Sequence, residues 1–360
     1  MRSMTIMMVG GVFDDNGGRR SGLIEKLANE LRAFGCQVSV FNGGHYNELS
    51  EHLEAAHYYD CLFWFADVPN DKPKINNLKF FAPHVMLVTS KRNDGQYSFQ
   101  DLVSRALNSR SNLLMEFRKQ HVVNPRQSTK HECRVVDPLG TVWCDYTDNL
   151  PRVARRTVER LRFLVSCTRQ SSNRAGDVIS VPDESEFFDI VRNLGERFHE
   201  LIAPADGVTR FLGNASFRCQ GGFPSFRAGQ YIFVSRRNID KRTIGPEGFV
   251  ATQLIDNMIW YWGDKPSVDT PIQLQLYRMF PNINYMVHSH TYIENAPFTK
   301  IPIPCGALEE VNEISSMITD PSVNRQAINL LGHGSLIMAD KPNINLFKHI
   351  SRPAPEIINF

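Results

Sequence analysis

The chain has 360 residues, more than one compact core usually holds, and this length predicts two domains. Hydrophobic residues make up 42% and charged residues 22%, and the formal net charge is only +2, so the overall charge offers no basis for binding nucleic acid or an anionic membrane. The seven cysteines are an odd number and include no Cys-x-x-Cys pair, so neither a disulfide framework nor a zinc ribbon is indicated.

The first residues, MRSMTIMMVGG, are typical of a first β-strand rather than of a signal peptide, because the apolar run is short and no small-residue cleavage site follows. No run of about eighteen apolar residues occurs, so no membrane span is expected. We therefore expect a cytoplasmic protein.

The first half alternates short apolar runs with amphipathic stretches. Strands are predicted at residues 4–9, 36–41, 60–68 and 84–90, and helices at 21–34 and 99–107. Strands that alternate with helices predict a Rossmann-like, doubly wound α/β domain with a parallel sheet. We place this domain at residues 1–172.

A glycine-rich turn, GGVFDDNGGRRSG, follows the first predicted strand. Open α/β sheets bind ligands at this edge, so backbone N–H groups with Arg19 or Arg20 could hold a phosphate or a nucleotide. The turn matches neither the GxGxxG nor the P-loop pattern, and a plain long loop is the alternative. FNGG, VPNDKPK and TSKRND follow later strands and would reach the same edge, which favours some ligand there.

A basic helix is predicted from Pro151 onward, with arginines along its length. Such a stripe can contact phosphates, but it is more often a solvated face or pairs with carboxylates, so no nucleic acid is expected. The polar run TRQSSNRAGD then predicts a domain boundary near residues 168–178. We place the second domain at residues 179–360, where an amphipathic helix opens with DESEFFDIVRNLGERFHELI.

Two histidines stand one residue apart in NINYMVHSHTYI, which is a predicted strand by its β-branched and aromatic content. Side chains two apart on a strand share one face, so His288 and His290 would project together. His333 follows between glycines in INLLGHGSL. Three imidazoles with an open fourth position are the arrangement of a catalytic zinc, whereas a His-x-His pair can also occur by chance.

The second half, from about residue 185 to 340, resembles the class II aldolase/adducin family. The resemblance rests on five motifs in the family's order, GNASFR, VSRRNID, PSVDT, VHSH and LGHG. It implies an α/β/α domain and a zinc held by His288, His290 and His333, although another divalent transition metal would also suit these ligands. Asp269 would take the place of the catalytic carboxylate.

The same resemblance implies a set of substrate-binding residues. In it, Asn214 and Ser267 would contact a substrate phosphate, and the residues that complete the set are Ser216, Ser235, Arg237 and Asn238.

The function that the resemblance implies is a zinc-dependent lyase of aldolase type. It would cleave or form a C–C bond in a phosphorylated keto-sugar through a metal-stabilised enediolate, with Asp269 moving the proton. A sugar-phosphate 4-epimerase with retro-aldol chemistry and a non-catalytic metal-binding scaffold or sensor are the alternatives. The family also contains a dehydratase, and its members are commonly homotetramers, so we expect a homo-oligomer.

The sequence departs from the family pattern at three places. The carboxylate is Asp269 rather than the glutamate of fuculose-phosphate aldolase, which favours the epimerase, and Arg237 and Asn238 replace the usual Thr/Ser-Gly of the second loop. The segment 298–326 is shorter than in the family, and the family's acid or tyrosine has no clear match in it. A glutamate within it could replace that acid, or these residues could form a solvated helix start; the candidates are Glu309, Glu310 and Glu313.

Overall fold

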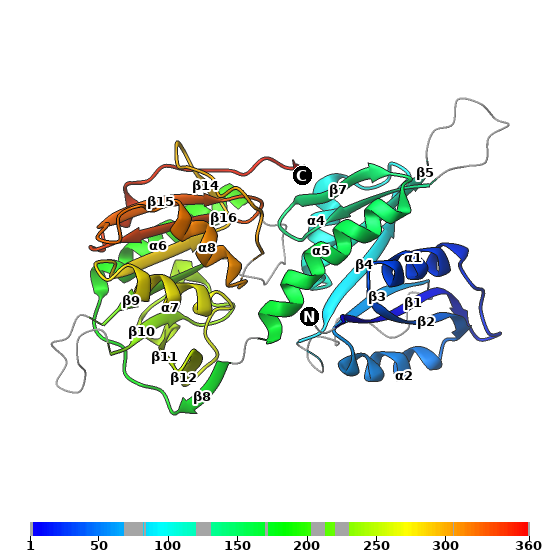
Figure 1. The fold of residues 1–360 in the computed structure, drawn as a ribbon, viewed down its shortest axis with the longest axis horizontal. Helices are drawn as coiled ribbons and strands as arrows, with labels where there is room; N and C mark the ends of the chain where they lie inside the picture. The colour runs from blue at the N-terminus through cyan, green and yellow to red at the C-terminus, as the bar shows by residue number, and fades with distance from the viewer. Residues whose placement is uncertain are drawn as a thin grey trace. The chain divides into compact units, whose positions relative to one another are not determined.

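The computed structural model describes residues 3–67, 82, 84–119, 131–169, 172–202, 213–219, 230–304 and 306–358. The predicted ligand-binding segment VPNDKPK, residues 68–74, lies outside these ranges. The chain divides into two compact units, Met1–Val165 with Ala354–Phe360 and Ser166–Pro353 (Figure 1). Within the described ranges, no helix combines the length and the apolar character that crossing a membrane requires.

The first unit is built on an eight-stranded sheet with the order β18-β7-β6-β5-β4-β3-β1-β2. Its strands are β1 (Thr5–Asp14), β2 (Gln37–His45), β3 (Cys61–Asp67), β4 (Met86–Arg92), β5 (Leu113–Lys119), β6 (His131–Val136), β7 (Thr141–Thr147) and β18 (Glu356–Ile357). Its helices are α1 (Gly22–Ala33), α2 (Glu48–Ala55), α4 (Phe99–Asn108) and most of α5 (Leu150–Arg169).

Parallel pairing joins β1 to β5, which confirms the Rossmann-like fold expected for this half. β1 lies between β2 and β3, so the chain crosses in opposite directions through α1 and α2, and right-handed crossovers place these helices on opposite faces of the sheet. Figure 1 accordingly shows β1 and β2 between α1 and α2. Two further strands, β6 and β7, extend the sheet with antiparallel pairing.

The glycine-rich segment after β1 forms a closed turn. Val12 and Arg19 exchange two backbone hydrogen bonds, of 2.8 and 3.1 Å, and the Asp14 carboxylate accepts from the N–H groups of Asn16 and Gly18 at 2.8 and 2.9 Å. These two bonds hold the pKa of Asp14 below its usual value. Several N–H groups that the sequence suggested for a phosphate are therefore used within the turn itself.

The predicted basic helix is α5, and part of its arginine stripe faces inward. Arg160 lies 3.7 Å from the centre of the Trp143 ring and 3.6 Å from Asp137. The Arg156 guanidinium donates to the Trp143 carbonyl at 3.2 Å. Both arginines are buried, so they stabilise the packing of α5 in this unit.

The second unit contains another eight-stranded sheet, with the order β15-β16-β13-β9-β10-β11-β12-β8. Its strands are β8 (Ser172–Gly176), β9 (Asn214–Arg218), β10 (Ile232–Ser235), β11 (Phe249–Ile255), β12 (Met258–Trp262), β13 (Tyr285–Ser289), β15 (Arg325–Leu330) and β16 (Gly334–Ala339). A small separate sheet pairs β14 (Tyr292–Ile293) with β17 (His349–Ile350). The helices are α6 (Ser185–Ile202), α7 (Thr270–Met279) and α8 (Glu309–Ser316), with 3-10 turns that include η3 (Lys241–Thr243).

Both faces of this sheet are covered, and alternate side chains of each strand point to different cores. On β10, Phe233 packs with the side chains of α6, whereas Ile232 and Val234 pack with those of α7 and α8. This division confirms the three-layer α/β/α architecture expected for the second half.

The division into units differs from the expected boundaries of 1–172 and 179–360. Within the polar run, Ser172–Gly176 forms β8, which pairs in parallel with β12 of the second unit. At the other end, Glu356 and Ile357 pair with β7 of the first unit. Both differences rest on backbone hydrogen bonds. Such bonds produce no pattern of hydrophobic residues, so the sequence did not predict them.

Candidate metal centre

Strand β13 places His288 on the face of the sheet that α7 covers. Tyr285 and Val287 point to the α6 core and Met286 to the opposite core, so His288 follows Met286 by alternation. In the neighbouring strand β9, Asn214 is the register partner of His288. The sheet therefore sets these two side chains beside each other.

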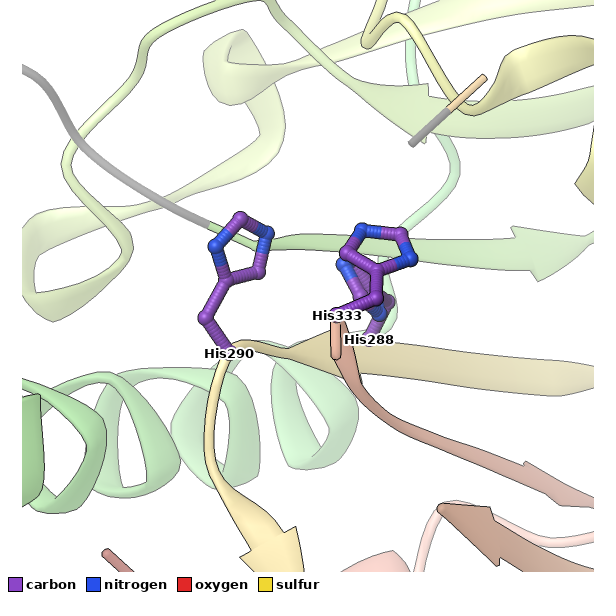
Figure 2. A group of neighbouring side chains, drawn as sticks. All are labelled: His288, His290 and His333. Atoms are coloured by element: carbon purple, nitrogen blue, oxygen red, sulfur yellow. The ribbon is translucent and has the colours of Figure 1, made fainter. Parts of the chain in front are cut away.

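His290 and His333 join His288 from two further segments. His290 follows the end of β13, and His333 lies in the tight turn between β15 and β16 (Figure 2). A Cβ atom on Gly334, whose φ is +154°, would lie 2.0 Å from the Ser289 carbonyl oxygen. Only glycine lets this turn approach β13 so closely, and the approach brings His333 to the other rings.

The three rings form a compact and buried cluster. Their ring centres are 4.5 to 5.2 Å apart, and one nitrogen of each ring lies within 4.8 Å of the corresponding nitrogens of the other two. His288, His290 and His333 are 4%, 9% and 1% exposed. The cluster predicted from the sequence is thus brought together by the fold.

Hydrogen bonds select the nitrogen that faces the cluster in two of the rings. Nδ1 of His288 lies 2.9 Å from the Ser335 carbonyl oxygen, which can only accept, so Nδ1 carries the proton. Burial, with His333 nearby, lowers the pKa of His288 to about 4, so at neutral pH its Nε2 presents a lone pair. In His333, Nδ1 lies 2.9 Å from Glu310 Oε1, which leaves Nε2 to face the cluster.

These residues fit a transition metal ion. Nε2 of His288 is buried and makes no hydrogen bond with the described residues, a costly arrangement that a bound ion would relieve. Three imidazole nitrogens suit zinc, and around one zinc they would lie about 3.4 Å apart. Small ring rotations would close the present separations of up to 4.8 Å.

Asp269 lies at the N-terminus of α7 and turns its carboxylate toward the histidines rather than capping its helix. Its Oδ2 accepts from Asn214 Nδ2 at 2.6 Å and lies 4.0 Å from His288 Nε2. The side chain is 5% exposed, and Oδ1 has no hydrogen-bond partner among the described residues. The predicted catalytic carboxylate therefore lies beside the cluster, and its Oδ1 accepts no hydrogen bond from the described residues.

Asn214 was expected to contact a substrate phosphate, but in the structure its amide contacts two protein side chains. Its amide oxygen accepts from Gln273 of α7, and its amide nitrogen donates to Asp269. The acceptor and donor ends of the amide are thereby fixed, and Asn214 orients the carboxylate. Sequence reasoning missed Gln273, although its position four residues after Asp269 on one helix puts both on the same face.

Among the three glutamates considered from the sequence, Glu310 reaches the cluster through His333. Glu310 is 3% exposed, and its carboxylate accepts from the His333 ring at 2.9 Å. Glu309 is exposed, and Glu313 accepts from the backbone of Lys300 and Ile301. A carboxylate bonded to the second nitrogen of a ligating histidine is a common support of metal sites.

The remaining predicted residues are placed differently. Ser216 is fully buried and its hydroxyl bonds to the Tyr277 hydroxyl at 3.1 Å, which makes it part of the packing between β9 and α7. Ser235, also fully buried, accepts from the Ala215 N–H at 3.1 Å. The structure does not present either hydroxyl to a substrate.

The loop after β10 and the turn before Asp269 are joined by their backbones. Ser267 N–H donates to the Ser235 carbonyl and Arg237 N–H to the Lys265 carbonyl, both at 3.0 Å. Ser267 is half-buried, whereas Arg237 and Asn238 are exposed, and Asn238 adopts a left-handed φ of 58°. The loop thus lies against the segment that carries Asp269.

Comparisons with known proteins place these observations in a family. Residues 197–340 match the model of the Class II Aldolase and Adducin N-terminal domain. A methylthioribulose-1-phosphate dehydratase from Picosynechococcus sp. is 39% identical over 66 residues, which are 17% of this chain and 30% of that protein. The chain therefore spans less than a third of the length of this curated relative.

Solved structures resemble parts of the chain at low identity. An L-fuculose 1-phosphate aldolase aligns with 45% of this chain and 78% of its own, at 15% identity and a TM-score of 0.31. The DNA/pantothenate metabolism flavoprotein from Streptococcus pneumoniae aligns with 45% of this chain and 99% of its own, at 12% identity and a TM-score of 0.37.

The matched range contains all three histidines, Asp269 and the strands that position them. It lies within the second unit, Ser166–Pro353. Residues 197–340 of this chain, which carry the candidate site, are thus similar to the class II aldolase and adducin family.

Proposed function

We propose that the second unit is a zinc-dependent lyase of aldolase type that acts on a phosphorylated keto-sugar. The observation that carries this proposal is the convergence of three buried imidazoles beside an uncommitted oxygen of Asp269. The family match and the name of the related dehydratase, which acts on a sugar phosphate, support the same class of reaction.

His288, His290 and His333 would hold the ion, with His288 bonded through Nδ1 to Ser335 and His333 to Glu310. When bound there, zinc would supply a Lewis acid that polarises the carbonyl group of the sugar. The protein's own contribution is to fix the two supported rings and to exclude water from the ligating nitrogens through their burial.

Asp269 would move a proton at the carbon next to the sugar carbonyl. Its Oδ2 is held by Asn214, so Oδ1 is the oxygen that accepts the proton and returns it. In C–C cleavage, the hydroxyl on the far carbon of the broken bond would lose its proton to Asp269 as that carbon becomes an aldehyde. The electron pair of the broken bond would pass to the carbon beside the carbonyl, and Asp269 would return the proton there. Gln273, which holds Asn214, keeps the carboxylate in place during the transfer.

The phosphate of the sugar would lie toward the turn that precedes Asp269. Ser267 is half-buried there, and the backbone bond between Arg237 and Lys265 keeps the exposed Arg237 and Asn238 beside the same turn. A guanidinium at this place offers a fork of N–H donors that matches a phosphate.

A dehydratase is the second candidate, because the curated relative with 39% identity carries that name. Dehydration would begin with transfer of the proton on the carbon beside the carbonyl to Asp269. The C–O bond on the next carbon would then break, and the hydroxyl would leave with that proton as water. The two reactions therefore share Asp269 and differ in the bond that is cleaved.

The metal is tested by elemental analysis of the full chain after gentle purification. We expect about one zinc per chain in the wild type and a near-complete loss in a His288→Ala/His290→Ala variant, because a single remaining imidazole holds zinc weakly. His199→Gln, an exposed histidine on α6 outside the cluster, should keep its zinc. A wild type without any transition metal contradicts the proposed function.

The reaction is tested with the zinc-loaded protein and two kinds of substrate. Aldol addition of dihydroxyacetone phosphate to small aldehydes identifies an aldolase, and water loss from a 1-phosphorylated ketopentose identifies a dehydratase. Asp269→Asn should lower the turnover rate by about 100-fold or more while zinc stays bound. Zinc-loaded protein that converts none of these substrates argues for a non-catalytic metal site.

A further inference from the structure

Lys241 is a buried lysine at the start of η3, and no sequence motif drew attention to it. Its side chain is 8% exposed, and it packs where α6 carries Gly195, whose added Cβ would lie 3.0 Å from the Lys241 Cβ. Among the described residues, its ammonium makes no hydrogen bond and no ion pair within 4.0 Å. A buried charge without a close partner is costly and is rarely kept without a function.

Two carboxylates act on Lys241, and one of them is already neutralised. Asp240 is bound by the Arg242 guanidinium through Nη2 at 2.7 Å and Nε at 3.0 Å. The other carboxylate is Asp269, whose charge favours the protonated lysine. Burial outweighs both carboxylates and lowers the pKa of Lys241 to about 8, so the ammonium is mostly charged at neutral pH.

The backbone holds the Lys241 segment against the turn that carries Asp269. Ser235 accepts from the Ser267 N–H at 3.0 Å, and Arg236 forms a β-bridge with Pro266. Lys241 therefore approaches Asp269 from the loop after β10, whereas the histidines approach it from β13 and the turn before β16. The charge of Asp269 is therefore felt by Lys241, while its Oδ2 lies 4.0 Å from His288 Nε2.

The charges of the site then favour an anionic ligand. A divalent ion contributes +2 and Lys241 +1, whereas Asp269 and Glu310 contribute −1 each, so the sum is +1. An oxyanion bound next to Lys241 would give its ammonium the close partner that the described residues do not provide.

We propose that Lys241 is a substrate-binding residue of this site and that its ammonium binds the phosphate group of the sugar. This inference rests on the proposed function for the nature of the substrate. Lys241 would thus add a buried point charge to the exposed fork of Arg237, and together they would hold the phosphate from two sides.

The test is calorimetric titration of the zinc-loaded full chain with inorganic phosphate, and with acetate as a carboxylate probe. Lys241→Met keeps the length of the side chain and removes its charge. We expect this variant to bind phosphate about 10- to 100-fold more weakly, the usual effect of losing a hydrogen bond to a charged group. Lys341→Met, an exposed lysine in the turn after β16, should bind phosphate as the wild type does.

Each outcome separates this inference from the function on which it rests. Unchanged phosphate affinity in a Lys241→Met protein that keeps its zinc overturns the role of Lys241 and leaves the lyase intact. If the wild type holds no zinc but still binds phosphate, and Lys241→Met loses that binding, the result supports Lys241 and rejects the metal-dependent reaction. A wild type that binds acetate but not phosphate overturns the assignment of the phosphate group.

Discussion

Two histidines in the cluster are each held by a hydrogen bond through Nδ1. Ser335 supplies a backbone carbonyl to His288, which no side-chain substitution removes, whereas Glu310 supplies a carboxylate to His333. The carboxylate both fixes the ring and raises its basicity, so the affinity for a metal depends on Glu310 more than on Ser335.

Substitution of Glu310 by Gln should weaken zinc binding about 10- to 100-fold, because the amide supports the His333 ring less strongly than the carboxylate does. The measurement is competition with a chelator of known zinc affinity. Glu309→Gln, at the exposed neighbouring position of α8, is the matched control and should bind zinc normally. Equal affinities in both variants would show that Glu310 does not support the metal site.

Lys241 predicts a stability that depends on pH. Its pKa is lowered from 10.5 to about 8 in the folded chain, so between these values the unfolded state binds more protons and the free energy of unfolding rises with pH. Below about pH 8 both states are protonated and the full cost of the buried charge remains; above about pH 10.5 both are neutral and the cost is gone. The charged groups that act on Lys241 are Asp240 and Asp269.

Lys241→Met removes this titration. The unfolding free energy of the variant minus that of the wild type should therefore fall by about 3 kcal/mol between pH 7 and pH 10.5, because the wild type gains stability over this range. Each unit of pKa shift corresponds to about 1.4 kcal/mol. Denaturant unfolding of both proteins at several pH values measures the difference, in which all other titrations cancel. A difference that stays constant with pH would rule out a charged, buried Lys241.

At the scale of the elements, the site depends on how closely neighbouring strands and turns approach β13. Gly213 precedes β9 with a φ of +81°, and a Cβ there would lie 2.6 Å from the His288 carbonyl oxygen. Gly334 allows the same close approach on the other side of the strand. Glycines therefore set the spacing between the three segments that carry Asn214, His288 and His333.

Gly213→Ala should destabilise the second unit by about 1–3 kcal/mol, because alanine is strained at this φ and its Cβ would collide with β13. Zinc affinity should fall with it, as β13 is displaced. Gly22→Ala is the control, since nothing lies within 4 Å of its added Cβ and α1 is helical there. Thermal unfolding checks both variants, and an unchanged melting temperature in Gly213→Ala would contradict the close approach.

On the scale of the whole molecule, the predicted metal site belongs entirely to one of the two units. His288, His290 and His333 all lie in Ser166–Pro353, and so do Asp269, Glu310 and Lys241. The first unit has its own sheet and its own core around β1, β3 and α2. A ligand of the metal site therefore acts on the stability of the second unit.

Zinc at about 1,000 times its dissociation constant should stabilise the second unit by about 4 kcal/mol, because it binds the folded site and not the unfolded chain. Hydrogen exchange of the full chain, read by mass spectrometry with and without zinc, should show slower exchange in β13, β9 and β16. The strands of the first unit, β1 to β5, serve as the internal control and should exchange at unchanged rates. Protection confined to the first unit would contradict the location of the site.

Several features follow from local patterns, which the sequence contains in full. The amphipathic stretch at 21–34 became α1, and Gly35, with a φ of +81°, follows its end, where glycine commonly terminates a helix. The His-x-His spacing predicted that two imidazoles project together, and His333 stands between two glycines, one of which allows the close approach to β13. In each case the residues that decide the geometry are neighbours in the chain.

Other features were decided by contacts between distant segments. Glu310 was one of three glutamates on one short stretch, and only the packing of α8 selected it as the partner of His333. Asn214 was expected to bind phosphate, but α7 brings Gln273 and Asp269 against its amide. Lys241 became a candidate binding residue only because the structure buries it. The pairing of the polar strand β8 and the pairing of Glu356–Ile357 with the first unit also show no side-chain pattern that would predict them.

The sequence alone thus determined which residues are the candidates for the chemistry, because the three histidines and Asp269 stand in short motifs with fixed spacing. Only the tertiary structure decided which side chains support them and where the chain divides. The physical reason is that backbone pairing and burial depend on distant partners, and local spacing does not encode them.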